Sequence, residues 1–157
     1  MTSSSPNYIK YTKNIKALLF YAPNQSFPGA TCKPNGSLAY PMLAGAMLKK
    51  GIEVEIFDAC VGSDRDDLEK MFYKATDISN GLLRTGVSEE RILEEVRHFD
   101  VIGFTSIFSS QESILLSTIR LIKAAFPEKL LIAGGFNARH RMNSFFASGI
   151  DLISTSE

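Results

Sequence analysis

The sequence predicts a doubly wound α/β domain with a mostly parallel five-stranded sheet flanked by helices, of the Rossmann-like or flavodoxin-like kind. Short apolar runs such as IKALLFY at 15–21 are nearly continuous, which is typical of strands buried on both faces. These runs alternate with helical patterns long enough to act as crossover connections between parallel strands. A chain of 157 residues suits one such domain.

The first predicted strand, 15–21, leads into a Pro-, Gly- and Asn-rich segment at 22–37 that is long for a strand-to-helix link. A helix is predicted over Tyr40–Lys50, because Pro41 suits a helix start and Gly51 suits a helix end. Its body, MLAGAML, is apolar on nearly every side, so we expect this helix to be deeply packed.

The second predicted strand is Glu53–Phe57, and DACVGS follows it. A charged helical stretch is expected over 64–73. The next segment, 74–87, has the least regular pattern in the chain, and we interpret it as a helical insertion.

Ser88 is a candidate N-cap for a helix that leads into a third strand at 101–105. Ser109 and Glu112 have the spacing of a capping box for the following helix. Both helices repeat apolar residues at helical spacing, in the stripes Ile92, Leu93, Val96 and Phe99, and Leu115, Ile119, Ile122 and Phe126.

A fourth strand is predicted at 130–133, followed by Gly134 and Gly135. A helix over 138–148 and a short strand at 151–153 complete the pattern βαβαβαβαβ. In sheets of this kind, ligands bind in the crevice outside the carboxyl ends of the strands. The candidate site residues therefore lie in the segments that follow each strand.

Composition and charge exclude several classes of function. Lys and Arg total 17, as do Asp and Glu, so no net field would attract a phosphate backbone or an anionic membrane. Residues 1–14 form a polar leader without an apolar stretch, so we expect a cytoplasmic protein. Cys32 and Cys60 lie far apart, which excludes a disulfide scaffold or recognisable zinc site and predicts reduced thiols.

The strand ends lack the common nucleotide and catalytic motifs. No GxGxxG follows the first strand, no GxxxxGK[ST] occurs, and the third strand ends in GFTSIF where a phosphorylatable Asp would stand in a response-regulator receiver. A flavodoxin-type phosphate loop is matched only loosely, which leaves FMN as a weaker alternative. No Ser/His/Asp set, carboxylate pair or activated cysteine can be assembled, so this chain alone is not expected to catalyse a reaction.

Four segments in order carry a resemblance to a known family: SLAYPMLAGAMLKKGIEVEIFDA, DVIGFTSI, LIAGGFNA and DLISTSE. Together they resemble the amino-terminal cobalamin (B12)-binding domain of B12-dependent radical S-adenosylmethionine (SAM) enzymes. The resemblance runs over 15–157, and so divides the chain into the leader and one domain.

Cobalamin proteins carry an Asp-x-His-x-x-Gly motif, a Ser-x-Leu motif and a Gly-Gly pair. The resemblance implies that the corresponding residues here surround the cofactor: Asp58, Ala59, Cys60 and Gly62; Thr105, Ser106 and Ile107; and Gly134, Gly135, Phe136 and Asn137. Glycine would leave room for a bulky dimethylbenzimidazole tail. The hydroxyls of Thr105 and Ser106 would bond polar atoms of the buried tail.

Two departures qualify the resemblance. Cys60 stands where cobalt-ligating histidine would be, so the resemblance implies no histidine ligand and no protein metal ligand. The cobalt face would then lie near Asn24 or Gln25 in the first loop, while a thiolate ligand from Cys60 is a minor alternative. Ser156 replaces the usual glycine at the end of the domain.

The resemblance implies a cobalamin-binding module of a radical SAM enzyme, with methyl transfer as a candidate reaction of the parent protein. The iron–sulfur cluster and S-adenosylmethionine would belong to a downstream radical SAM domain, a partner in cis or in trans, because this chain has no CxxxCxxC motif. The alternative is a cofactor-free module of the same fold that serves interaction or scaffolding.

Overall fold

A computed structural model describes residues 15–30, 37–78 and 81–155. Predictions that concern the leader, Cys32 and Ser156 lie outside these residues.

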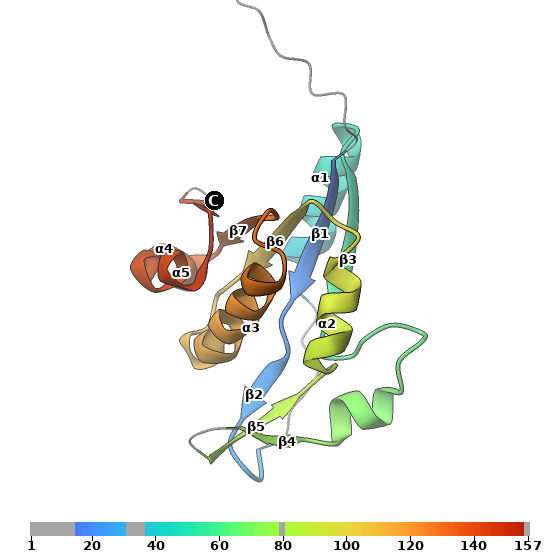
Figure 1. Cartoon of the computed structure of the whole chain (residues 1–157), viewed down its shortest axis with the longest axis vertical. Helices are drawn as coiled ribbons and strands as arrows, with labels where there is room; N and C mark the ends of the chain where they lie inside the picture. Colours follow the sequence, from blue (N-terminus) through green and yellow to red (C-terminus); the bar gives the residue numbers. More distant parts are fainter. Residues whose placement is uncertain (1–14, 31–36, 79–80, 156–157) are drawn as a thin grey trace, which may run out of the picture.

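The main sheet has five parallel strands, which confirms the predicted fold class (Figure 1). It is built from strands that match the apolar runs of the sequence: β1 (Lys16–Tyr21), β3 (Glu53–Asp58), β6 (Val101–Thr105), β7 (Leu130–Gly134) and β8 (Leu152–Ile153). The order across the sheet is β3-β1-β6-β7-β8. The order reverses between β1 and β6, and this switch point is where open α/β sheets bind ligands.

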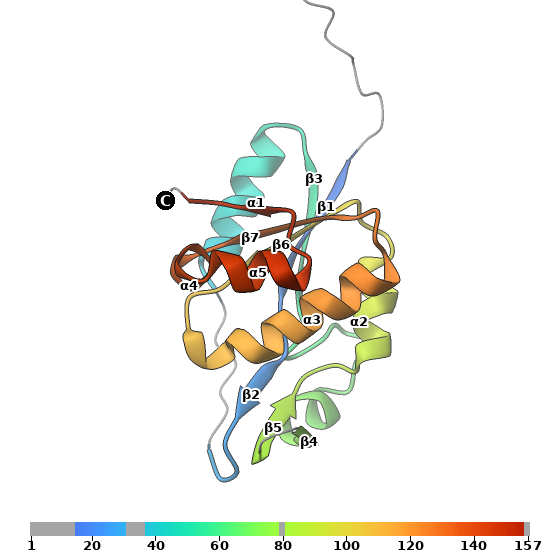
Figure 2. The ribbon, with the colours of Figure 1, turned by 60° about the vertical axis from the view of Figure 1, so that its left-hand side comes forward.

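Helices cover both faces of the sheet (Figure 2). One face carries α1 (Ala39–Lys49), and the other carries α2 (Glu89–Val96), α3 (Glu112–Ala125) and α5 (Met142–Ser148). The single helix predicted over 138–148 is instead two helices, since α4 (Phe136–His140) ends at Arg141, whose φ of −117° interrupts helical geometry.

The larger core lies between the sheet and α2, α3 and α5. Alternate residues of the strands point into it, as the period of two in a strand requires. The ring of Phe20 is fully buried and lies 5.9 Å from the ring of Phe57 and 5.6 Å from that of Phe104, centroid to centroid. The predicted stripes of α2 and α3 pack against these rings, which confirms them.

Helix α1 contradicts the expectation of deep packing. Only Tyr40 and Ala44 of this helix are buried, while Met42 is 76% exposed and Leu43 is 49% exposed. The helix contacts β3 and β1 on one side, but the described residues place no second layer over its other apolar side. An apolar surface is therefore open along α1.

A second sheet replaces the helical insertion that we expected at 74–87, so that expectation is wrong. It contains β2 (Asn24–Ser26), β4 (Thr76–Ile78) and β5 (Leu82–Thr85), antiparallel in the order β2-β5-β4. Gly81 has a φ of 70°, a conformation that glycine adopts at little cost, and stands just before β5. Figures 1 and 2 show the small sheet beyond the carboxyl end of β1.

The helical stretch expected over 64–73 shrinks to one π-helical turn, η1 (Glu69–Tyr73). The reason is local, because Asp66 accepts hydrogen bonds from the Ser63 amide at 2.8 Å and from its hydroxyl at 3.0 Å, which stabilises a loop. Arg91 of α2 holds that loop, with its Nε 3.2 Å from Asp66 Oδ1.

The two predicted helix starts have different outcomes. Ser88 caps α2 as expected, since its Oγ accepts from the Arg91 amide at 3.2 Å. The predicted capping box of Ser109 and Glu112 does not form, so that prediction is wrong. Ser109 instead begins a 3-10 turn, η3 (Ser109–Gln111), which has no side-chain cap. The carboxylate of Glu112 is used elsewhere, in the network described below.

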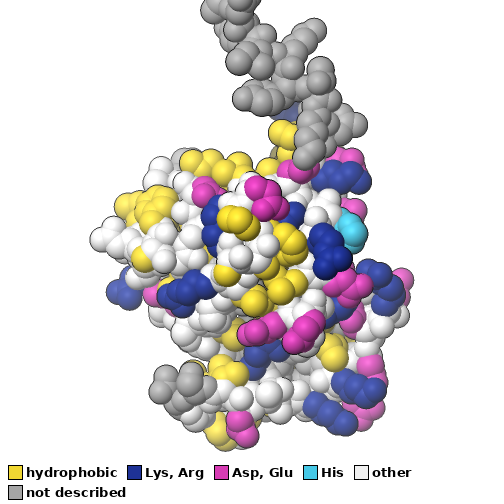
Figure 3. Space-filling view, in the orientation of Figure 1, with side chains coloured by type: hydrophobic (Ala, Val, Ile, Leu, Met, Phe, Trp, Pro, Cys, Tyr) yellow, Lys and Arg dark blue, Asp and Glu magenta, His cyan; other side chains and the backbone are white. Residues whose placement is uncertain are grey.

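The surface carries both signs of charge. Figure 3 shows acidic and basic side chains interspersed over the viewed face, as the balanced composition leads one to expect. None of the helices in the described ranges is long and apolar enough to span a lipid bilayer.

Candidate functional site

A cavity of about 480 Å³ opens at the carboxyl ends of β1 and β6. We call it the strand-end cavity. It lies at the switch point of the sheet and reaches under the small sheet, since Asn24 of β2 lines it. Its other lining residues come from the segments after β1 and β6 and from the start of α1, and include Tyr21, Leu38, Ala39, Thr105, Ser106, Ile107 and Phe108.

A larger groove of about 710 Å³ runs along the sheet face that carries α1. We call it the α1 groove. Its floor is the face of β1, β6 and β7 opposite the larger core, where Leu19, Gly103 and Ile132 stand side by side in register. Its wall is the open side of α1, with Met42 and Leu43. Thr105, Ile107 and Ala39 line both the groove and the strand-end cavity, so the two spaces adjoin.

Tyr40 fastens the strands where the two spaces meet. Its buried hydroxyl donates to the Phe20 carbonyl oxygen of β1 at 2.7 Å and accepts from the Thr105 amide of β6 at 3.1 Å. Burial is the main cause that raises the pKa of this hydroxyl, so it stays protonated and can donate. Tyr40 thereby fixes the separation of the two strands at the switch point.

The two glycines after β7 have different roles. Gly135 has a φ of +94°, and a Cβ there would lie 2.6 Å from the Ser106 carbonyl oxygen, so the turn itself requires glycine. Gly134 lies on the α1 groove, and a Cβ there would meet only Ser154 Cβ, at 3.7 Å. The space beside Gly134 is therefore open to the groove, and the backbone conformation at Gly134 does not require glycine.

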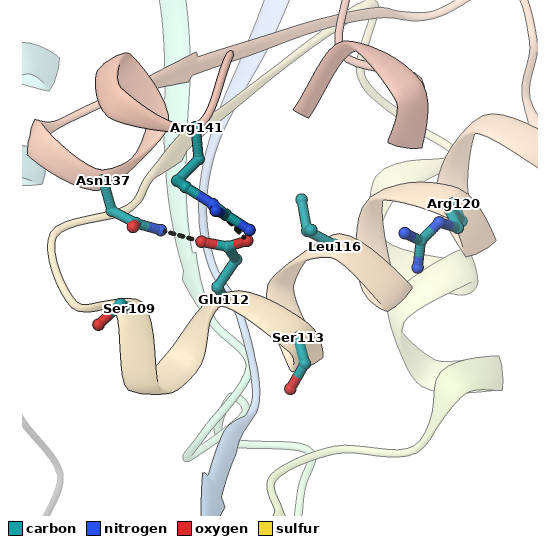
Figure 4. A pocket seen from close by; sticks show the side chains of 7 residues that line it. All are labelled: Ser109, Glu112, Ser113, Leu116, Arg120, Asn137 and Arg141. Atoms are coloured by element: carbon teal, nitrogen blue, oxygen red, sulfur yellow. Dashed lines mark hydrogen bonds and ion pairs between the residues drawn. The ribbon is translucent and has the colours of Figure 1, made fainter. Parts of the chain in front are cut away.

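Ser106 and Asn137 belong to one buried network that continues to the far face of the sheet (Figure 4). The Asn137 side-chain amide donates to Ser106 Oγ at 3.0 Å and to Glu112 Oε2 at 2.9 Å. Figure 4 shows Asn137 and Arg141 converging on Glu112, with Arg120 standing apart in the same cavity of about 490 Å³. Asn137 thus holds the Ser106 hydroxyl by a hydrogen bond and lines neither the groove nor the strand-end cavity.

The motif after β3 forms a tight turn. Asp58 Oδ1 accepts from the Cys60 amide at 2.8 Å, and the Cys60 thiol donates to the Ala22 carbonyl oxygen at 3.3 Å. Burial is the main cause that raises the pKa of the Asp58 carboxyl. Asp58, Ala59, Cys60 and Gly62 line neither the groove nor the strand-end cavity, so the structure places them one strand away from those spaces.

Asn24 and Gln25 separate in the structure. Asn24 lines the strand-end cavity. Gln25 is buried, and its side-chain amide contacts the Ser110 carbonyl oxygen at 2.5 Å and the Ser113 hydroxyl at 2.7 Å. Its backbone exchanges two hydrogen bonds with the Gln111 side chain, each of 2.9 Å. Gln25 therefore fastens the small sheet to the start of α3.

Aromatic and cationic side chains stand at the mouth of the α1 groove. Phe136 is 59% exposed, and its ring centroid lies 4.0 Å from that of His140. The guanidinium carbon of Arg139 lies 6.0 Å from the Phe136 ring centroid, and Arg139 also lines the groove. His98 and His140 are both exposed, as expected for surface histidines.

Several residues of the site did not emerge from the sequence. The groove is lined by Tyr40, Met42, Leu43, Gly103 and Ile132, which lie in the segments that carry the resemblance but are not among the predicted cofactor-binding residues. Two signals were available in the sequence. A helix that is apolar on all sides can bury only one side against a sheet, so another side is left for a further contact. A glycine within a central strand indicates that another group comes close to the backbone there. Gly103 in GFT is such a glycine.

Comparisons with known proteins bear on this site. No family model matches the chain. A cytidylyl-2-hydroxyethylphosphonate methyltransferase from Streptomyces wedmorensis is 30% identical over an alignment of 109 residues, and the alignment covers 64% of this chain and 19% of the methyltransferase. The chain thus matches about a fifth of the length of this curated relative.

Two solved structures share the fold. One is a cobalamin-binding protein from Desulfitobacterium hafniense DCB-2, with a TM-score of 0.56 and 15% identity over 92% of this chain and 54% of that one. The other is a putative pilus assembly-related protein from Burkholderia pseudomallei K96243, with a TM-score of 0.51 and 7% identity over 94% of this chain and 81% of that one.

Proposed function

We propose that this chain is a cobalamin-binding module whose α1 groove receives the dimethylbenzimidazole tail and whose strand-end cavity faces the corrin ring. The observation that carries the proposal is the junction of the two spaces at the switch point of the sheet. A cofactor with a broad ring and a long tail needs two adjoining spaces of this kind. The cobalamin-binding structural neighbour and the methyltransferase relative support the same reading.

The residues present fit such a tail. The groove floor is apolar at Leu19 and Ile132, and Gly134 leaves space that a Cβ would fill. Thr105 stands where the groove and the strand-end cavity meet, with its amide held by Tyr40, and Ser106 is held by Asn137. Both hydroxyl-bearing residues are therefore positioned before any ligand arrives, which lowers the entropic cost of binding.

When bound, the corrinoid would supply cobalt chemistry such as the carrying of a methyl group. The chain itself would bind the ring, hold the tail and exclude water beneath it. The described residues place Asn24 in the strand-end cavity, and the Cys60 thiol is engaged with Ala22. We therefore propose that Asn24 would contact the corrinoid from the strand-end cavity and that Cys60 would not.

The parent protein is proposed to be a radical SAM enzyme, with methyl transfer as its reaction. The methyltransferase relative, of which this chain matches a part, supports methyl transfer, and the radical SAM assignment rests on the resemblance of the sequence segments. The iron–sulfur cluster and S-adenosylmethionine would then bind a separate domain, in cis or in trans.

Titration with hydroxocobalamin, followed by calorimetry and the visible spectrum, tests the proposal. Gly134→Leu adds a side chain within the groove at a position with a normal backbone, and Gly45→Leu adds the same side chain on α1 where no atom lies within 4 Å and outside both spaces. Micromolar or tighter binding is typical of a dedicated cofactor site, and we expect Gly134→Leu to weaken it at least about tenfold. Gly45→Leu should bind as the parent does.

Gly135 is unsuitable for this test, because any side chain there would collide with the Ser106 backbone and unfold the turn. Absence of heat and of a spectral change with the parent chain would discard the cofactor assignment. The exposed apolar side of α1 would then be assigned to the alternative function, interaction with another protein.

A further inference from the structure

The α1 groove has a polar mouth and an apolar depth. Its polar lining residues, Thr105, Arg139 and Ser154, lie at or beyond the carboxyl ends of β6, β7 and β8. Deeper along the strands the floor is formed by Leu19, Gly103 and Ile132, and then by Ala17 and Val101. From Thr105 to Val101 the groove follows the five residues of β6, and the four steps between them span about 13 Å at the rise of a parallel strand.

The floor of the groove is apolar and contains one glycine on each of two neighbouring strands. Gly103 lies between Leu19 and Ile132 in register, and Gly134 lies beside Thr105 on the next strand. β6 and β7 thus each have one position without a side chain on the face that lines the groove. A Cβ at Gly103 would lie 3.1 Å from Leu19 Cδ2, so the Leu19 side chain lies over Gly103, whereas the space beside Gly134 is open.

The groove has few partners for polar groups in its depth. Tyr40 also lines the groove, but its hydroxyl oxygen already donates to the Phe20 carbonyl and accepts from the Thr105 amide. The wall of α1 presents Met42, Leu43 and Met47. A ligand group that needs hydrogen bonds would therefore lose its water in the depth of the groove without compensation.

We propose that the α1 groove selects among corrinoids by the base at the end of their tail, preferring a flat apolar benzimidazole to a purine. This inference rests on the proposed function. An adenine carries an exocyclic amine and extra ring nitrogens that dimethylbenzimidazole lacks. Each such group left unpaired weakens binding by about five- to 150-fold.

The inference makes Leu43 a specificity-determining residue. Leu43 is 49% exposed on α1 and lines the groove, so glutamine can replace it without disturbing the core. Glutamine is a good helix former, and its amide can bond a purine from the wall. Leu48 lies on the same helix, is 60% exposed and does not line the groove, so Leu48→Gln is the matched control.

The test is a set of calorimetric titrations of the parent chain, Leu43→Gln and Leu48→Gln. Three ligands are compared: cobalamin, the cobamide that carries adenine as its base, and cobinamide, which has neither nucleotide nor base. For the parent we expect cobalamin to bind at least about tenfold more tightly than either of the others. Leu43→Gln should reduce the preference over the adenine cobamide at least threefold, and Leu48→Gln should preserve it.

Three results would overturn the inference while leaving corrinoid binding intact. They are equal affinity of the parent for the two bases, cobinamide that binds as tightly as cobalamin, and an unchanged preference in Leu43→Gln. If no corrinoid binds at all, the proposed function fails and this inference fails with it.

Discussion

Tyr40→Phe removes one oxygen atom from the switch point of the sheet and should destabilise the whole domain. The ring of Tyr40 is buried and packs edge-on against Tyr21, with 6.0 Å between centroids, and phenylalanine keeps that contact. What is lost is the pair of hydrogen bonds to the Phe20 carbonyl and the Thr105 amide. The substitution therefore isolates the hydroxyl.

The magnitude follows from the two backbone groups left without a partner. A lost buried hydrogen bond costs about 1 kcal/mol and an unsatisfied buried group about 1–3 kcal/mol, so we expect about 2–3 kcal/mol in the free energy of unfolding. For a chain of 157 residues this lowers the melting temperature by about 5–10 °C.

The assay is urea unfolding followed by circular dichroism, with Tyr73→Phe as the control. Tyr73 is 74% exposed, and its ring keeps its edge contact with Phe72 after the hydroxyl is removed. We expect the control to change the free energy of unfolding by less than about 0.5 kcal/mol. A Tyr40→Phe variant as stable as this control would refute the role assigned to the hydroxyl.

Alkaline pH provides an independent check on Tyr40. Burial raises the pKa of its hydroxyl in the folded chain above the value near 10 of the unfolded chain. The stability that this group contributes is therefore fully present below about pH 10 and is lost as the pH rises toward the folded-state pKa. The difference in stability between the parent and Tyr40→Phe should shrink above about pH 10, and a constant difference would contradict the argument.

Three further substitutions test other parts of the structure. Asp58→Asn should stabilise the chain at pH 7, because burial raises the pKa of the Asp58 carboxyl and so makes its charged form unfavourable in the folded chain. This gain in the free energy of unfolding should vanish near about pH 3, where the carboxyl is protonated in the folded and the unfolded chain. Unfolding curves at the two pH values measure the gain. Gln25→Ala should speed hydrogen exchange in β4 and β5 while leaving β1 protected, and uniform exchange would contradict the anchoring role. Arg91→Ala should lower the free energy of unfolding in urea by about 3 kcal/mol, because it leaves the largely buried Asp66 carboxylate without its cationic partner. A loss below about 1 kcal/mol would contradict this.

The main sheet could be predicted because β1, β6 and β7 are apolar runs bounded by turn residues, and because β3 alternates glutamate with apolar residues at the period of a strand. Periodicity likewise identified the buried stripes of α2 and α3, and the chemistry of serine identified the cap of α2 at Ser88. These features depend on residues close together in the sequence. They therefore need no knowledge of the rest of the fold.

The small sheet could not be predicted in this way. Its strands have three or four residues, and β2 is a polar NQS segment within a loop. Its pairing joins Asn24 to Thr85, which are far apart in the chain, and a local pattern carries no signal of that contact. Gln25 likewise becomes an anchor only because α3 lies beside it.

The role of the predicted site residues in binding a cofactor stays a prediction, but the structure shows which of them border the two spaces. The groove or the strand-end cavity is lined by Asn24, Thr105, Ser106, Ile107, Gly134, Gly135 and Phe136. The sequence treats Gly134 and Gly135 as one pair, but the positive φ of Gly135 and its approach to Ser106 separate their roles. The apolar pattern of α1 also cannot distinguish a helix packed on all sides from one that borders a groove.

The small sheet has a consequence for the order in which the chain folds. The small sheet is joined to η3 and α3 through the Gln25 side chain of β2, which bonds Ser110 and Ser113. The parallel sheet and α3 must exist before the Gln25 amide has anything to bind. The part of the strand-end cavity that Asn24 lines is therefore completed after the part formed by the ends of β1 and β6.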